Sequence, residues 1–180
     1  LDAYVESIWI CRNAPQPHAL ERILPSGAAQ LIVNLKEDET RLYDSLDPGR
    51  CATAAGTILS GPYSRFQVID TSEQEHVAGV AFKPGGTVPF ISVPADEMSD
   101  GDIPLAALWG RRATAALREQ LLESRDADAA LDVLEATLRA HFSPGLHPAV
   151  AFALTAFARA SGTATIADVT RAIGMSPKRF

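Results

Sequence analysis

The apolar pattern of the chain changes its period near Pro94, and this change constrains the fold more than any other feature of the sequence. Before Pro94, short apolar runs of strand length are separated by breaks in which glycine supplies positive φ and proline pre-sets the turn. The clearest runs are 7–11, 29–35, 65–69 and 76–82, and the breaks are 25–27, 47–49, 60–62 and 84–86. Many short strands at this spacing predict a β-sandwich or a small barrel over residues 1–93.

After Pro94 the apolar residues recur at helical spacing. A third helix is predicted to begin near Pro148, because proline is favoured in the first turn of a helix. The two helices expected before it each have an apolar stripe. The first stripe consists of Leu117, Leu121 and Leu122, and the second consists of Leu131, Leu134, Leu138 and Phe142. We therefore expect a helical region over residues 94–160, with apolar faces that cover either the β-rich part or a partner chain.

The composition is that of a chain that can bury a core. Of its 180 residues, 47% are hydrophobic and 21% are charged, which argues against intrinsic disorder. No apolar run is long enough to cross a bilayer and no signal peptide is visible, so we expect no membrane contact and a cytoplasmic location. The sequence does not begin with Met, so we expect its start to be processed or trimmed. Cys11 and Cys51 lack metal-ligand spacing, and reduced thiols are favoured over a single disulfide.

The net charge of −6 argues against nucleic-acid binding by the chain as a whole, because phosphate contacts need a basic face. The charge is distributed unevenly along the sequence. Residues 161–180 carry three basic side chains and one acidic side chain, a net charge of +2 that leaves −8 on the other 160 residues. The basic excess is therefore confined to the last segment of the chain.

Residues 165–180 have the pattern of a helix, a turn at Gly174 and the beginning of a second helix. Thr165 is placed to cap the first helix, with Asp168 three residues later as its capping-box partner. Ser176 is placed to cap the second helix. The expected buried face of the first helix is formed by Ile166, Val169 and Ile173. From the pattern alone, a DNA-binding helix-turn-helix and a generic helical hairpin both remain open.

The same sixteen residues resemble the first helix-turn-helix of AraC-type transcriptional regulators, including Gly174, Ser176 and the apolar position at Phe180. Thr170 departs from the family, which usually has a small alanine there, and the rest of the DNA-binding domain is absent from the sequence. The resemblance implies that Ser176, Lys178 and Arg179 contact DNA in the intact protein.

Upstream, segments 21–27, 30–35, 79–86 and 105–110 resemble, in this order, the cupin-like sensor domain of some AraC-type regulators. The resemblance implies an α+β chain with a cupin-like, jelly-roll-like β-barrel over residues 1–93. It further implies a helical dimerisation and relay region over 94–160 and the start of an incomplete helix-turn-helix over 161–180. The implied partners are a small-molecule effector in the barrel, a second copy of the chain, and DNA in the intact protein only.

Five side chains are the candidates for lining the effector pocket: Trp9, Arg22, Asn34, Arg65 and His76. Each also has an ordinary structural interpretation. The tryptophan and the histidine would be core residues, since alternation places His76 on one strand face with Val80 and Phe82. Arg22 would form an ion pair at the rim and Arg65 would be solvated. The amide of Asn34 interrupts an apolar strand and needs hydrogen-bond partners.

The residue inventory favours a sensor over an enzyme. The four histidines, His18, His76, His141 and His147, include no His-x-His pair, so we expect no metal and no cofactor. The sequence also lacks a G-x-S-x-G elbow and a phosphate-binding glycine loop. Two alternatives remain open at this point: a metal-independent cupin-type enzyme, such as an isomerase or lyase, and a dimerisation module that binds no ligand.

Overall fold

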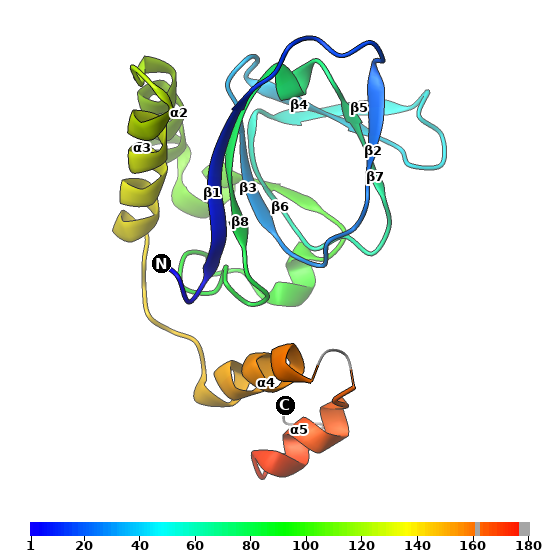
Figure 1. Ribbon diagram of the computed structural model, residues 1–180, viewed down its shortest axis with the longest axis vertical. Helices are drawn as coiled ribbons and strands as arrows, with labels where there is room; N and C mark the ends of the chain where they lie inside the picture. Colours follow the sequence, from blue (N-terminus) through cyan, green and yellow to red (C-terminus); the bar gives the residue numbers. More distant parts are fainter. Residues whose placement is uncertain (161–162, 177–180) are drawn as a thin grey trace. The chain divides into compact units, whose positions relative to one another are not determined.

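The computed structural model describes residues 1–160 and 163–176 of the chain (Figure 1). The chain divides into two compact units, Leu1–Phe142 and Ser143–Phe180. All the strands of the described residues lie in the first unit. The functional boundaries expected at residues 93 and 160 stay predictions.

A five-stranded antiparallel sheet forms the centre of the first unit. In spatial order its strands are β1 (Val5–Arg12), β8 (His76–Phe82), β3 (Gln30–Asn34), β6 (Thr57–Ser60) and β9 (Asp102–Pro104). A second antiparallel sheet has the order β2 (Leu20–Ile23), β7 (Gln67–Asp70), β4 (Glu39–Tyr43) and β5 (Cys51–Ala55). The four apolar runs predicted as strands overlap β1, β3, β7 and β8, with bounds that differ by up to two residues.

The two sheets face each other, but they do not close into a barrel (Figure 1). Within the described residues, every strand pair belongs to one sheet or the other. In the smaller sheet, β4 meets β7 only through the pair Tyr43 and Val68. The predicted α+β class is therefore confirmed, whereas the two sheets do not close into the predicted barrel. The edge strands of one sheet form no hydrogen bonds with the edge strands of the other, and closure of a barrel requires such bonds.

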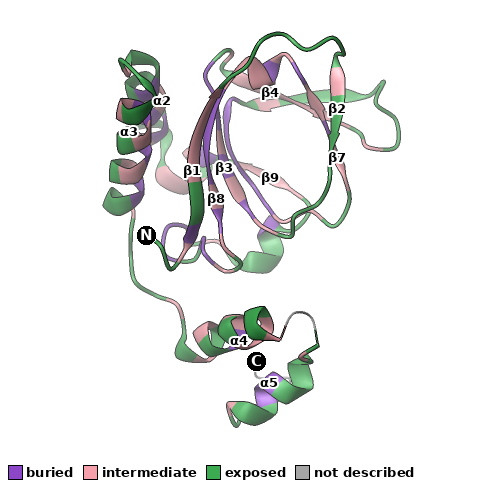
Figure 2. Cartoon of the chain, in the orientation of Figure 1, coloured by how far each residue is buried: buried purple, intermediate pink, exposed green. Residues whose placement is uncertain are grey.

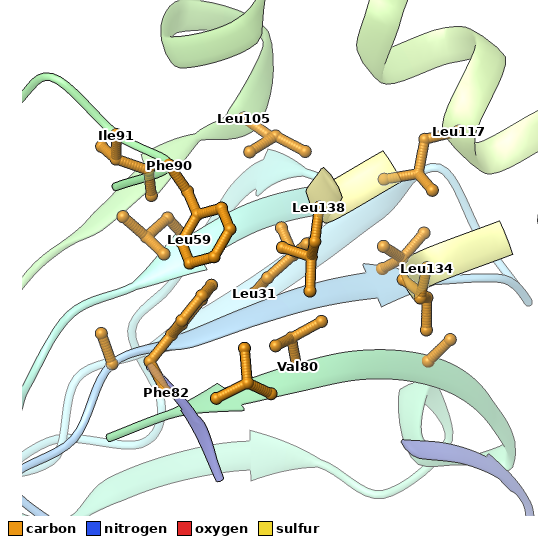
Figure 3. Close-up of a cluster of buried hydrophobic side chains, with 14 of the residues drawn as sticks. Leu31, Leu59, Val80, Phe82, Phe90, Ile91, Leu105, Leu117, Leu134 and Leu138 are labelled. Carbon is orange, nitrogen blue, oxygen red and sulfur yellow. The ribbon is translucent and has the colours of Figure 1, made fainter. Parts of the chain in front are cut away.

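The hydrophobic core lies between the larger sheet and two helices, α2 (Arg111–Glu123) and α3 (Ala127–Ala140), as Figure 3 shows. The sheet contributes alternate residues of its central strands, including Leu31, Leu59, Val80 and Phe82. The helices contribute Leu117, Leu121, Leu134 and Leu138, all almost completely buried. The short helix α1 (Leu105–Trp109) adds Leu105 to this cluster. The amphipathic pattern therefore serves to cover one face of the sheet.

This packing uses most of the leucines that suggested a surface for a partner chain. Four of them face the sheet of their own chain, and Leu131 is half-buried. Leu122 of α2 is 44% exposed. Figure 2 shows exposed residues, drawn in green, on the side of α3 that faces away from the sheet. The leucine stripes therefore pack mainly within one chain and leave little apolar surface exposed for a partner chain.

Two 3-10 turns complete the first unit, η1 (Glu73–Glu75) before β8 and η2 (Ala95–Met98) before β9. Helix α3 begins at an N-cap formed by Asp126, whose side chain accepts a hydrogen bond from the N–H of Ala129 at 2.8 Å. In the described residues, no helix combines the length and the apolar character needed to cross a membrane.

The second unit contains α4 (Pro148–Arg159) and α5 (Ile166–Ala172). The predicted start of α4 at Pro148 is confirmed, with the proline in its first turn. The predicted capping box of α5 is also present. The Thr165 hydroxyl accepts from the N–H of Asp168, whose carboxylate accepts from the N–H of Thr165, both at 3.2 Å.

Helix α5 ends at Gly174, as the sequence predicts. Gly174 has a φ of +68°, and the N–H of Met175 donates to the carbonyl of Thr170 at 2.9 Å. This is a Schellman cap, which places a glycine in the left-handed region. The predicted apolar face is only partly correct, because Val169 is buried but Ile166 is 57% exposed. The buried position next to Val169 is Thr170, whose hydroxyl donates to the carbonyl of Ala167.

Candidate functional site

A cavity of about 490 Å³ lies between the two sheets. Because side chains alternate along a strand, Gln30, Ile32 and Asn34 of β3 line the cavity, while Leu31 and Val33 pack in the core beneath the helices. The opposite wall comes from the smaller sheet, including Leu42 and Val68. The volume is that of an ordinary small-molecule site, and its walls combine apolar side chains with many polar and charged ones.

One wall of the cavity is the indole of Trp9, which lies on the inner face of the larger sheet. Trp9 pairs across the strands with Gly79. A Cβ added at Gly79 would lie 2.6 Å from Cζ2 of the indole and 2.5 Å from the carbonyl oxygen of Leu31. The glycine therefore lets the indole lie against the backbone of β8, where it leaves the cavity open.

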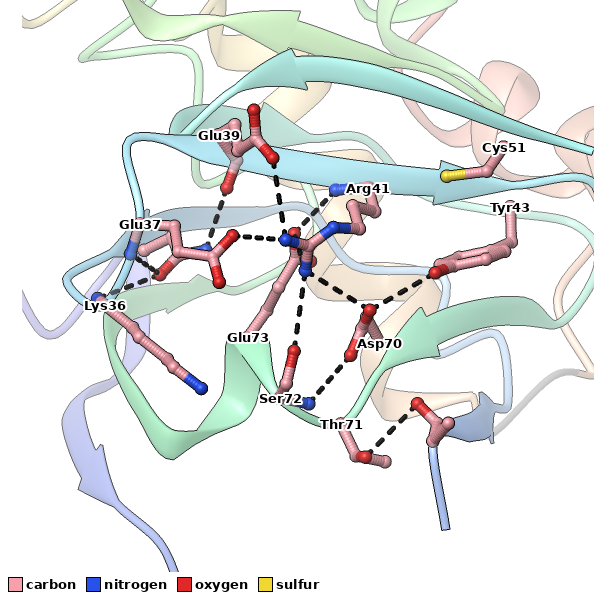
Figure 4. Close-up of polar contacts among 12 residues, drawn as sticks. Lys36, Glu37, Glu39, Arg41, Tyr43, Cys51, Asp70, Thr71, Ser72 and Glu73 are labelled. Carbon is pink, nitrogen blue, oxygen red and sulfur yellow. Dashed lines mark hydrogen bonds and ion pairs between the residues drawn. The ribbon is translucent and has the colours of Figure 1, made fainter. Parts of the chain in front are cut away.

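At one end of the cavity, Arg41 of β4 is surrounded by carboxylates (Figure 4). Its Nη1 lies 3.2 Å from Asp70 and 3.6 Å from Glu73. Its Nη2 contacts Glu37 and lies 3.5 Å from Glu39. These carboxylates therefore compensate the positive charge of the Arg41 guanidinium.

Glu73 is the most buried acid of this network, with only 4% of its surface exposed. Its carboxylate accepts the backbone N–H of Arg41 at 2.7 Å. Burial raises the pKa of Glu73 to about 7, against the opposing effects of the Arg41 N–H and the Arg41 charge. The neighbouring Tyr43 hydroxyl donates to Asp70 at 3.2 Å, and burial together with Asp70 raises the pKa of Tyr43 to about 12. The phenol is therefore a hydrogen-bond donor at neutral pH.

At the other end of the cavity, the hydroxyl of Tyr63 donates to Oδ2 of Asp102 at 2.8 Å. Burial, and then the charge of Asp102, raise the pKa of Tyr63 above its ordinary value, so the phenol stays protonated. Among the described residues, Oδ1 of Asp102 is the one buried side-chain oxygen or nitrogen without a hydrogen-bond partner. An unsatisfied carboxylate oxygen of this kind is costly and calls for a donor.

The backbone around this pair is held closely. The N–H of Gly61 donates to the carbonyl of Gly101 at 2.9 Å, and a Cβ at Gly61 would lie 1.7 Å from the carbonyl oxygen of Met98. Asp100, with a φ of +54°, accepts hydrogen bonds from the N–H and the hydroxyl of Ser64. The segments that carry Tyr63 and Asp102 are therefore held together, which fixes the backbone from which the carboxylate projects.

Residues 1–104 match the model of a family described as a domain of unknown function (DUF6597). The chain belongs to the DUF6597 family. All the strands and every residue that lines the cavity lie within the matched segment. No curated protein and no solved structure matches the chain.

Of the five candidate pocket residues, the DUF6597 cavity is lined by Trp9, Asn34 and Arg65 but not by Arg22 or His76. Arg22 instead lies over the ring of Phe66, 4.9 Å from its centroid. His76 shares its strand face with Ala78, Val80 and Phe82, and that face is the one beneath the helices. Its ring accepts a hydrogen bond from Nε of Arg12 at 3.2 Å.

The amide of Asn34 is committed to the turn between β3 and β4. Its Nδ2 donates to the carbonyl of Glu39 at 2.8 Å, and its oxygen accepts the N–H groups of Lys36 and Glu37 at 3.0 Å each. Asn34 therefore lines the cavity with a side chain whose polar groups are already satisfied.

Five residues of the site were not predicted from the sequence pattern: Arg41, Tyr63, Glu73, Gly79 and Asp102. Asp102 opens a three-residue strand, which is too short to show any period. A signal was available for Gly79, since an isolated glycine within a strand pattern suggests a close approach.

The sequence also predicts that a metal site is absent and that three residues near the end of the chain contact DNA. Across residues 1–160 and 163–176, no three His, Cys, Asp or Glu side chains are grouped so as to hold a metal ion. Of the three residues predicted to contact DNA, Ser176 is described and exposed, whereas Lys178 and Arg179 lie outside the described residues.

Proposed function

We propose that this chain is the effector-binding part of an AraC-type transcriptional regulator, with the two-sheet region as a cupin-like, jelly-roll-like sensor domain. The observation that carries the proposal is the cavity between the sheets, whose size and mixed lining suit a small molecule. Its lining combines polar groups, among them Glu73 and Asp102, with apolar groups such as Trp9, and such a lining can orient a ligand.

Support for the regulator class comes from α5 and the turn that follows it. The capping box at Thr165 and the Schellman cap at Gly174 give the helix and sharp turn that a helix-turn-helix needs. In the intact protein, Ser176, Lys178 and Arg179 would then contact DNA. AraC-type regulators usually have alanine at the position of Thr170. In this chain the Thr170 hydroxyl donates to the carbonyl of Ala167, which satisfies the extra polar group.

The proposal includes a homodimer through the helical region 94–160. Its support is the family resemblance, the prevalence of two-fold dimers, and the exposed Leu122 on α2. Sedimentation would show a dimer at micromolar concentration, and a monomer there would remove this part of the proposal.

A metal-independent enzyme of cupin type is the second candidate, and one observation favours it. Glu73 lines the cavity, and its pKa of about 7 suits a general acid or base. An enzyme would turn over the compounds that bind, whereas a sensor would bind them unchanged.

The test of the proposed function is a thermal-shift screen of small molecules on the full chain, followed by product analysis of each hit. We expect saturable stabilisation without turnover. Ile32→Trp places a large side chain from β3 into the cavity and should abolish the shift. Leu46→Trp, at a position that is 81% exposed between β4 and β5 and outside the cavity lining, is the matched control and should retain it. Shifts that survive in Ile32→Trp would contradict the proposal, and turnover would favour the enzyme.

A further inference from the structure

We infer that the cavity takes an amphipathic amine, with its protonated nitrogen at Asp102 and its apolar body against Trp9. This inference rests on the proposed function of the cavity as a small-molecule site and names the chemical class of the ligand.

The strand register of the larger sheet builds the two halves of this site. One row across the sheet joins Gln30 to Ser60 and Ser60 to Asp102, and all three side chains line the cavity. The next row on the same face joins Ile58 to Ile32 and Ile32 to Gly79, over which the indole of Trp9 lies. A polar row and an apolar row therefore run side by side on the cavity face. They are two residues apart along the strands, which is about 7 Å.

The acceptor in the polar row is the carboxylate of Asp102. Tyr63 donates to Oδ2 and leaves Oδ1 without a partner among the described residues. The Oδ1 atom is shielded from solvent. Asp102 lines the cavity, and because the terminal torsion of an aspartate is soft, rotation of its carboxylate would present an oxygen to a ligand there. A donor that reaches it there relieves an unsatisfied buried acceptor.

The charges around the cavity favour a cation over an anion. Three carboxylates, Glu73, Asp100 and Asp102, and two arginines line it. The charge of Arg41 is already compensated by Glu37, Glu39 and Asp70, which surround it together with Glu73.

The other arginine, Arg65, is exposed. The N–H and hydroxyl of Ser64 lower the pKa of Asp100, and Arg65 adds to that shift through its charge. Arg65 therefore lies close enough to Asp100 for their charges to interact. An anion would meet arginines that already have acidic neighbours, whereas an ammonium would meet an acid with a free oxygen.

The test compares three probes that share an indole and differ in the polar group: tryptamine, tryptophol and indole-3-acetate. Isothermal titration calorimetry on the unaltered full chain measures the order of affinity, so this arm depends on no variant. We expect tryptamine to bind at least about tenfold more tightly than the alcohol or the acid, because one charge-assisted hydrogen bond raises the affinity by about that factor.

Two variants locate the effect. Asp102→Asn should reduce tryptamine binding about tenfold, to the level of tryptophol, because it removes the charge and keeps the shape. Asp96→Asn removes the same charge from an exposed position outside the cavity and should leave all three affinities unchanged.

The inference is overturned if the alcohol or the acid binds as tightly as the amine, if Asp102→Asn leaves tryptamine binding unchanged, or if none of the probes binds at millimolar concentration. A different outcome would reject the proposed function. Binding of the alcohol or acid that Ile32→Trp abolishes would keep the cavity as a ligand site and reject the amine. The absence of any hit sensitive to Ile32→Trp in the wider screen would reject the site itself.

Discussion

Trp9 lies against Gly79 so closely that a single methyl group at the glycine would overlap both the indole and the backbone of the neighbouring strand. The two residues are partners in the register of β1 and β8. One small residue on a central strand thus sets both the packing of the sheet and the position of a cavity wall.

Gly79→Ala should therefore destabilise the protein. The added Cβ meets the carbonyl oxygen of Leu31 at 2.5 Å, and a central strand cannot shift without moving its neighbours. We expect a loss of about 2 kcal/mol in the free energy of unfolding, measured by urea denaturation. Gly101→Ala is the control, because its Cβ would have no neighbour closer than 3.9 Å. Equal stability of the two variants would contradict this account.

Glu73 should make stability depend on pH. Its pKa is about 7 in the folded protein and 4.5 for the free side chain, so the folded state binds the proton more tightly. The stability contributed by this group is complete below about pH 4.5 and is lost as the pH rises through about 7, a change on the order of 3 kcal/mol. Arg41, Asp70 and Glu37 face the carboxyl and contribute to its pKa.

Glu73→Gln cannot titrate, so we expect it to gain stability relative to the unaltered chain as the pH rises from about 5 to 8. Urea denaturation across this range measures the difference. Glu97→Gln changes an exposed glutamate and should keep the slope of the unaltered chain. Parallel pH profiles for Glu73→Gln and the unaltered chain would show that burial does not control this carboxyl.

Gly174→Ala should weaken the end of α5. The glycine has a φ of +68°, where an L side chain is strained, and we expect a loss of about 1 kcal/mol in local stability. Hydrogen exchange of the Val169 and Met175 amides reports this loss directly. Gly145→Ala, in the same unit, has no neighbour closer than 3.8 Å and serves as the control. Unchanged protection in Gly174→Ala would argue against the Schellman cap.

Residues 1–180 alone should not bind DNA with sequence selectivity. The net charge is −6, and only a few basic side chains lie near the expected contact surface. So few phosphate contacts give weak association that falls steeply with salt. Fluorescence anisotropy against the promoter region of its own gene, at roughly physiological salt, measures this. Sub-micromolar, sequence-selective binding would contradict the prediction.

Local signals in the sequence were sufficient for several of the elements, but not for a strand as short as β9. The period of the apolar residues predicts strands β1, β3, β7 and β8 and the apolar stripes of α2 and α3, because burial of one face imposes that period. Proline and glycine chemistry likewise predicts the start of α4 at Pro148 and the end of α5 at Gly174, since these residues act through their own backbone.

Only the tertiary structure decided which face of each strand meets the cavity. Alternation groups His76 with Val80 and Phe82 but carries no information about which side the helices cover, and both faces of the larger sheet carry large apolar side chains. The helices cover the His76 face, so the predicted histidine lies away from the cavity that Trp9 lines. Arg41 and Glu73 are 32 positions apart in the chain, and Tyr63 and Asp102 are 39 apart. Their pairing depends on strand order and register, which arise from long-range packing that no local pattern encodes.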